Sequence, residues 1–82
     1  MSEREPLIDV FEEEDHLIVL AELPGIDEKN VKIKTNENTI TITAENAKKK
    51  YLKIVRLPTR VNKDTIQYTY RNNILQVRLE KL

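Results

Sequence analysis

Two runs of alternating apolar and polar residues, 66–71 and 74–79, flank the pair Asn72–Asn73. Asparagine tolerates a positive φ angle better than most residues other than glycine, so the pair can form a two-residue type I′ turn. This turn predicts a β-hairpin in which Tyr70 faces Leu75 and all the apolar side chains share one face. Because an isolated ribbon of two strands is marginally stable in water, further strands must cover that face.

The rest of the chain carries the same kind of pattern. Short apolar or alternating runs separated by Asn, Asp, Pro or Gly predict five more strands, at 7–12, 17–23, 31–35, 39–44 and 51–57. Residues 26–30 have room for one helical turn, and no run has the length and periodicity of a long helix. About seven short strands predict an all-β fold, an immunoglobulin-like antiparallel β-sandwich. We expect one domain over residues 6–82, preceded by a flexible tail at 1–5.

Composition limits the function classes. The 82 residues contain no cysteine, and 14 acidic residues balance 14 basic ones. A net charge of zero does not favour nucleic acid or an anionic membrane as a partner. No apolar stretch is long enough to span a bilayer, and the first residues do not resemble a signal peptide. We therefore expect a cytoplasmic protein with no nucleic acid or membrane partner.

Candidate catalytic residues are scarce. His16 is the only histidine and is expected at a turn, while Ser2 is the only serine and lies in the expected tail. No glycine-rich loop could cradle a phosphate, and no His or Cys cluster has the spacing of metal ligands. The sequence predicts no catalytic residue, cofactor or metal, and it indicates a protein that binds through its surface.

Two charged runs have both a functional and an ordinary interpretation. The four acids at 12–15 could hold a cation, but they are more typical of a solvated loop. The lysines at 48–50 could steer an acidic partner, although such a run is usually solvated too.

Four stretches resemble the α-crystallin domain of small heat-shock proteins. They are PLIDVFE at 6–12, AELPG at 21–25 followed by VKI at 31–33, YLKIVRLP at 51–58 and NNIL at 72–75. The resemblance covers the chain from Pro6 to Leu79, in order and with matching spacing. It identifies the chain as similar to a minimal, archaeal-type domain, without the N-terminal arm and C-terminal I-x-I tail of that family.

Some positions depart from the family pattern. Tyr68 stands where the signature has Ala, Asn73 where it has Gly, and Lys53 where many members carry Arg. Only six residues separate Ala44 from Tyr51. Many relatives have a long loop here, with a strand that a second subunit borrows, and this chain has no room for that strand.

The resemblance implies an ATP-independent chaperone, a holdase that binds partly unfolded client proteins. In such a sandwich, two neighbouring sheet edges would flank an apolar groove that accepts I-x-I peptide segments by strand addition. The residues expected to line the groove are Val31, Ile33, Ile66, Tyr68 and Tyr70. The alternative is that they are ordinary core residues. Sheet edges also offer a route to a homodimer.

A second surface and three other functions stay open. Phe11, Ile18, Leu20 and Ile74 are expected on the face opposite the core, either as a patch that contacts an N-terminal arm or as scattered apolar residues. A co-chaperone domain of the CS type shares the sandwich, but the chain has no Trp. A scaffold module of a larger protein or assembly is the second alternative. The third, an enzyme, lacks convergent catalytic residues.

Overall fold

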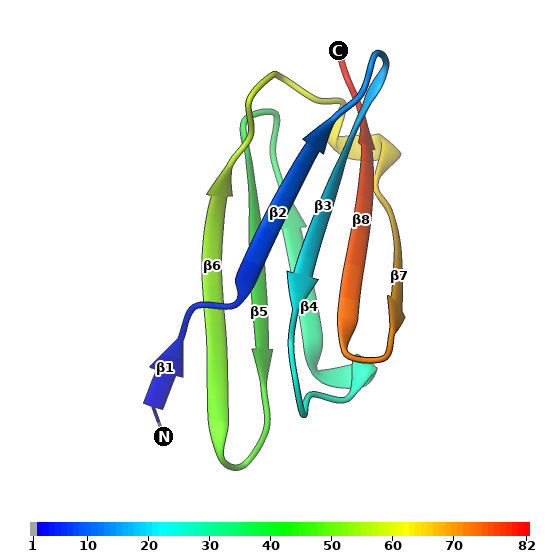
Figure 1. Ribbon diagram of the computed structural model, residues 1–82. Coiled ribbons are helices and arrows are strands. Elements are labelled where there is room, and N and C mark those ends of the chain that lie inside the picture. Colours follow the sequence, from blue (N-terminus) through cyan, green and yellow to red (C-terminus); the bar gives the residue numbers. More distant parts are fainter. Residues whose placement is uncertain (1) are drawn as a thin grey trace.

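The structure, a computed structural model, describes residues 2–82 as two four-stranded β-sheets packed face to face (Figure 1). One sheet has the strand order β1–β6–β5–β4 and the other β2–β3–β8–β7. The strands are β1 Ser2–Arg4, β2 Leu7–Glu12, β3 His16–Glu22, β4 Val31–Thr35, β5 Thr39–Glu45, β6 Lys49–Arg56, β7 Gln67–Arg71 and β8 Ile74–Glu80, and the two 3₁₀ turns are η1 Glu28–Asn30 and η2 Lys63–Thr65. The predicted all-β sandwich is confirmed, and residues 2–82 contain no α-helix.

The hairpin of β7 and β8 has the predicted register. Tyr70 pairs with Leu75 and Tyr68 with Val77. Asn72 and Asn73 have φ angles of 52° and 63°, so both turn residues adopt the left-handed conformation that a type I′ turn requires. The side chains of Leu75 and Val77 are fully buried, as the alternation predicts.

The core lies between the two sheets. Each inner strand contributes alternate residues to it, because successive side chains of a strand point to opposite faces. The largest fully buried side chains are aliphatic: Leu17, Val19, Leu23, Ile26, Ile40, Ile42, Val61, Leu75, Val77 and Leu79. Burying a side chain of this size contributes about 1.5–3 kcal/mol before the conformational entropy cost is subtracted.

The first residues differ from the flexible tail expected at 1–5. Ser2–Arg4 form β1, which pairs in parallel with Lys49–Tyr51 of β6. β5 pairs with the opposite edge of β6, so this edge is open to β1. Over residues 2–82 the sandwich therefore has eight strands and one parallel pair, and the sequence analysis did not predict the additional strand or the parallel pairing. Met1 lies outside the described residues.

A tight turn joins β5 to β6. Glu45 pairs with Lys50, and the Asn46 side chain accepts hydrogen bonds from the backbone N–H groups of Lys48 and Lys49 at 2.8 and 2.9 Å. The two strands thus pair directly up to the turn. This geometry agrees with the expectation that the segment has no room for an inserted strand.

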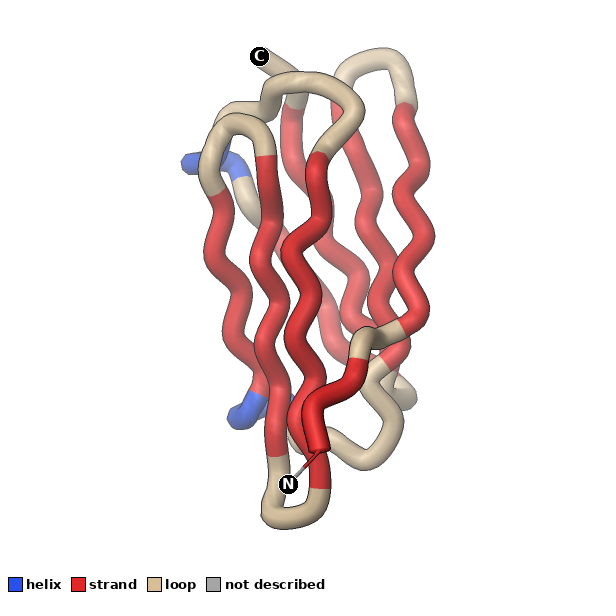
Figure 2. Tube along the Cα trace, turned by 90° about the vertical axis from the view of Figure 1, so that its left-hand side faces the viewer, coloured by secondary structure: helices blue, strands red, loops and turns tan. Residues whose placement is uncertain are grey.

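The topology places an edge strand of one sheet beside an edge strand of the other on each side of the sandwich. Because β1 and β2 follow one another through a two-residue link, their edges lie on one side of the sandwich. The opposite edges, β4 and β7, consequently lie together on the other side. Both 3₁₀ turns lie near the β4 edge, one at each end of the sheets (Figure 2). None of the helices within residues 2–82 is long and apolar enough to cross a membrane.

Candidate functional site

The β4 edge contributes two apolar side chains to the candidate groove. Val31 pairs with Ala44 of β5 and Ile33 pairs with Ile42, so both face inward beside buried residues. Val31 and Ile33 are half-buried and pack against the core. Among residues 2–82, no strand covers these two residues on the side away from β5, because β4 is the last strand of its sheet.

The β7 edge and the residue before it contribute the other three. Ile66 and Tyr70 are half-buried and pack against the core. Tyr68 lies between them along the chain and is 53% exposed, although its backbone pairs with that of the buried Val77. Tyr68 is therefore the most accessible of the five residues predicted to line the groove.

Tyr70 also joins β7 to the loop before β4, at one end of the candidate groove. Its hydroxyl donates a hydrogen bond to the carbonyl oxygen of Ile26 at 2.7 Å and lies 3.1 Å from that of Leu23. The backbone N–H of Leu23 donates to the carbonyl of Asn73 at 2.8 Å. The β7–β8 turn is thus tied to the loop that leads into η1 and β4. Tyr70 has a structural role that the sequence analysis did not predict.

The other end of the groove is tethered more weakly. The hydroxyl of Thr35, the last residue of β4, donates to the carbonyl of Lys63 at 3.4 Å. Lys63 is the first residue of η2, which leads into β7. The Asn62 side chain accepts a hydrogen bond from Asp64 N–H at 3.1 Å and so begins this turn.

Between these tethers, the two edge strands are not paired to each other. β4 pairs only with β5 and β7 only with β8. No backbone hydrogen bond joins β4 to β7 in the described part of the chain. Each edge therefore has outward-facing N–H and C=O groups without a strand partner. The structure brings all five predicted residues to these edges, and their binding role stays a prediction.

The second predicted patch lies on the outer face of the other sheet. Phe11 pairs with Ile18, so these side chains are neighbours across β2 and β3. Leu20 lies two residues along β3, and Ile74 lies diagonally from it on β8. Phe11 and Ile74 are 46% and 43% exposed. The four residues thus form an oblique apolar row, and its function stays a prediction.

Three exposed carboxylates, those of Glu5, Asp15 and Glu37, form ion pairs. A hydrogen bond from Lys53 Nζ at 2.7 Å lowers the pKa of the Glu5 carboxyl, and one from Arg60 lowers the pKa of Glu37. His16 Nδ1 lies 2.6 Å from Asp15 and lowers the pKa of that carboxyl by hydrogen bonding. Exposed pairs of this kind contribute little to stability.

The charged groups do not converge on a reactive centre. Within residues 2–82, no three His, Asp or Glu side chains gather closely enough to hold a metal ion. This includes the acidic run at 12–15, where Glu12 pairs with Lys81 at 2.8 Å and Asp15 with His16.

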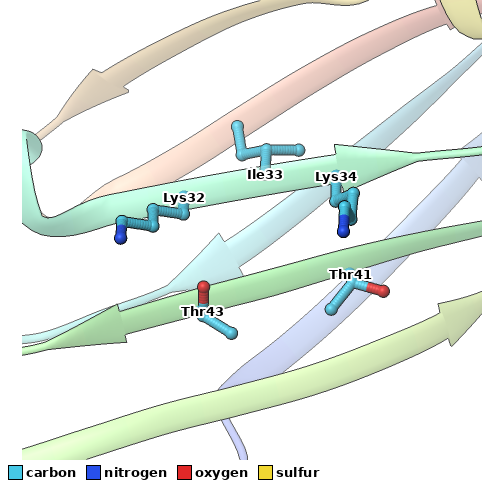
Figure 3. Close-up of a pocket in the computed structure, with 5 residues that line it drawn as sticks. All are labelled: Lys32, Ile33, Lys34, Thr41 and Thr43. Carbon is cyan, nitrogen blue, oxygen red and sulfur yellow. The ribbon is translucent and has the colours of Figure 1, made fainter.

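The sequence analysis missed a shallow trough on the outer face of β4 and β5. Lys32 and Lys34 extend from β4 on one side and Ile33 on the other, while Thr41 and Thr43 lie on β5 beside the lysines (Figure 3). The hollow has a volume of about 610 Å³. Alternation places Lys32, Lys34, Thr41 and Thr43 outward, but residue patterns do not reveal a hollow between side chains of neighbouring strands.

Comparison with known proteins identifies the family. Residues 14–79 match the family described as "HSP20-like domain found in ArsA". The chain belongs to this HSP20-like family. An HSP20-like domain is what the four sequence stretches predicted, and the predicted membership of the small heat-shock proteins is confirmed. Small heat-shock proteins are ATP-independent chaperones and not enzymes, which supports a chaperone-type role for this domain.

Individual relatives of this HSP20-like domain agree with the assignment. A probable 15 kDa heat shock protein of Leptospira interrogans is 26% identical over 93% of this chain and 69% of its own length. The Del-C4 mutant of hsp14.1 from Sulfolobus solfataricus P2 is 27% identical over 94% of this chain and 75% of its own, with a TM-score of 0.85. Heat shock protein 16.0 from Schizosaccharomyces pombe shares the fold with a TM-score of 0.86, at 23% identity over 98% of this chain and 68% of its own.

Proposed function

We propose that this HSP20-like domain is a holdase that binds extended segments of partly unfolded proteins between β4 and β7. The observation that carries the proposal is the pair of adjacent, unpaired sheet edges with half-buried apolar side chains beside them. Binding by strand addition needs no nucleotide, because backbone hydrogen bonds and apolar burial supply the free energy.

The backbone of β4 supplies part of the recognition. A strand in the groove would pair with edge groups that the fold leaves unpaired. Such pairing does not depend on the sequence of the bound segment, which suits a protein whose clients differ widely. The side chains of β4 alternate, with Lys32 and Lys34 turned away from the groove, so the charges do not oppose an apolar ligand.

The apolar side chains supply the preference for an I-x-I spacing. Residues two apart in an extended segment point to the same side. Two isoleucines with this spacing can therefore both enter the space lined by Ile33, Ile66 and Tyr68 while the segment pairs along an edge. The exposed ring of Tyr68 would become buried in the complex and contribute to its stability.

A peptide titration tests the groove. An I-x-I peptide is added to ¹⁵N-labelled protein, and a peptide with Ser in place of both Ile residues serves as the control. We expect amide shifts in β4 and in residues 66–70 with the first peptide and smaller shifts with the second. Shifts confined to other strands would reject the groove.

A client assay tests the holdase activity. Light scattering follows the aggregation of a heat-labile client protein, alone and with the domain at an equimolar concentration or at a tenfold molar excess over the client. We expect aggregation to be suppressed without added ATP. Peptide binding without any suppression would instead favour the second candidate.

That second candidate is an interaction module within a larger protein. The family description favours it, because it places such domains in ArsA. In this role the groove or the outer apolar row would bind one particular segment rather than many clients. One segment bound far more tightly than generic I-x-I peptides would distinguish the module from the holdase.

We also propose that two copies of this domain form a homodimer by pairing of their sheet edges. The outer edge of β2 has no strand partner, and β1 covers β6 only over Lys49–Tyr51. Edge pairing of this kind relies on backbone hydrogen bonds, so it should be insensitive to salt. Light scattering coupled to size-exclusion chromatography measures the mass, and a monomer at all concentrations would reject the dimer.

A further inference from the structure

Charge is strongly segregated along this electrically neutral chain. Ten of the fourteen acidic residues lie in the first 30 positions, whereas twelve of the fourteen basic residues follow them. The fold keeps this separation. Acidic residues gather on β2, β3 and their turn, whereas basic residues gather on β4 and β6.

The trough on the outer face of β4 and β5 is the basic part of this arrangement. A second hollow of about 150 Å³ continues the first, because Lys32 and Thr43 line both, and it extends to Lys50. Lys32, Lys34 and Lys50 take part in none of the four ion pairs within residues 2–82. Among the side chains that the structure describes, one carboxylate, Glu45, lines the trough. Three ammonium groups and the hydroxyls of two threonines thus line a surface suited to an anionic segment.

The turn between β2 and β3 is the acidic part. It projects at one end of the elongated molecule, which measures 38 × 20 × 19 Å (Figure 1). Glu13 and Glu14 are exposed at this turn and take part in none of the described ion pairs. The Glu13 N–H donates to the carbonyl of His16 at 2.9 Å, which closes the turn.

We propose that the trough of one copy binds the acidic β2–β3 turn of a second copy of this chain. The carboxylates of Glu13 and Glu14 at the turn are opposite in charge to the ammonium groups of the trough, and neither set takes part in the ion pairs described for this chain. The chain itself thus carries both complementary surfaces.

This contact has distinctive consequences. The two surfaces differ, so the association is heterologous and extends head to tail rather than closing into a symmetric dimer. A single hairpin turn buries little area, so the association is weak. Its attraction is largely ionic and exposed, and it decreases as the Debye length falls from about 10 Å at 0.1 M to about 3 Å at 1 M ionic strength.

Sedimentation velocity at increasing protein concentration tests the proposal at low and high salt. We expect the average sedimentation coefficient to rise with concentration at low salt and to return to the monomer value in 1 M NaCl. The double variants Lys32→Glu/Lys34→Glu and Glu13→Lys/Glu14→Lys should each remain at the monomer value. Circular dichroism verifies their folding, and the turn variant alone decides the outcome if the trough variant does not fold.

Mixing the two reversed variants is the decisive measurement. Each then offers the other a complementary surface, so association should return in the mixture at low salt. Lys63→Glu/Arg71→Glu is the matched control for the trough variant Lys32→Glu/Lys34→Glu. It makes the same change in net charge, but at exposed sites away from the trough.

Three results would overturn the proposal. They are a monomeric wild type at every salt concentration, association of the wild type that is independent of salt, and an equal effect of the control variant. Salt-independent association would instead point to the edge-paired dimer. A monomer that binds an oligoglutamate peptide would assign the trough to an acidic segment of another protein.

Discussion

The hydroxyl of Tyr70 on β7 donates a hydrogen bond to the carbonyl of Ile26, 2.7 Å away, in the loop that precedes β4. This bond joins β7 to the loop that connects the two sheets, at one end of the candidate groove. Replacing Tyr70 with Phe removes the hydroxyl but keeps the ring. We expect a loss of about 0.5–1.5 kcal/mol in the free energy of unfolding, measured by urea denaturation.

Tyr68→Phe is the control for that measurement. Tyr68 is on the same strand and exposed, and none of the hydrogen bonds described for residues 2–82 involves its hydroxyl. Its stability should change by less than about 0.5 kcal/mol, as is usual at surface positions. Equal effects of the two substitutions would contradict the structural role of Tyr70.

Tyr68→Ala should weaken peptide binding more than it affects folding. The ring is 53% exposed in the free protein, so its removal leaves the core intact. We expect the I-x-I peptide to bind roughly tenfold more weakly, because a buried aromatic contact of about 1.4 kcal/mol is lost. Calorimetric titration gives the affinity and urea denaturation the stability. Unchanged affinity would remove Tyr68 from the groove.

The β7–β8 turn provides a backbone test. Asn72 has a φ angle of 52°, which costs about 1–2 kcal/mol for an ordinary L-residue and little for glycine. Asn72→Ala should therefore lower the melting temperature clearly, whereas Asn72→Gly should leave it nearly unchanged. If both substitutions had the same effect, the strain at this position would not matter.

Acid should weaken the fold through the paired carboxylates. Hydrogen bonding lowers the pKa of Glu5, Asp15 and Glu37 in the folded protein. Their contribution is complete above the unfolded pKa values of about 4 and is lost as the pH falls through the lower folded values. The melting temperature should therefore fall between about pH 5 and pH 2. Glu37→Gln should reduce this slope, and Glu22→Gln, at an exposed position outside the described ion pairs, should not.

The outer apolar row gives a prediction independent of the groove. Phe11 is 46% exposed and adjoins Ile18. Phe11→Ser should reduce binding of the apolar dye ANS while leaving the I-x-I affinity unchanged. If client protection also falls, the row contributes to client capture, and if protection is unaffected, the row has another role.

The strands and the paired register of the final hairpin followed from the sequence because alternation and turn residues are local signals. Asn72 and Asn73 fixed the turn, and the turn fixed which residues of β7 and β8 face each other. The polar anchor of Tyr70 could not be foreseen, because its partner Ile26 lies 44 residues away and offers only a backbone carbonyl. The strand Ser2–Arg4 was missed for a related reason. Its short, polar sequence carries no pattern, and it pairs only because β6 presents an open edge.

The two tethers between the β4 and β7 edges would limit the length of any segment held in the proposed groove. β4 is five residues long, from Val31, which follows η1, to Thr35, which is hydrogen-bonded to Lys63 of η2. Five residues in extended conformation span about 17 Å. A bound chain can therefore form a continuous ladder over about five residues before the loops at each end turn it away. Each domain would therefore bind only a short extended segment of a client. Several copies would have to bind a long client at the same time.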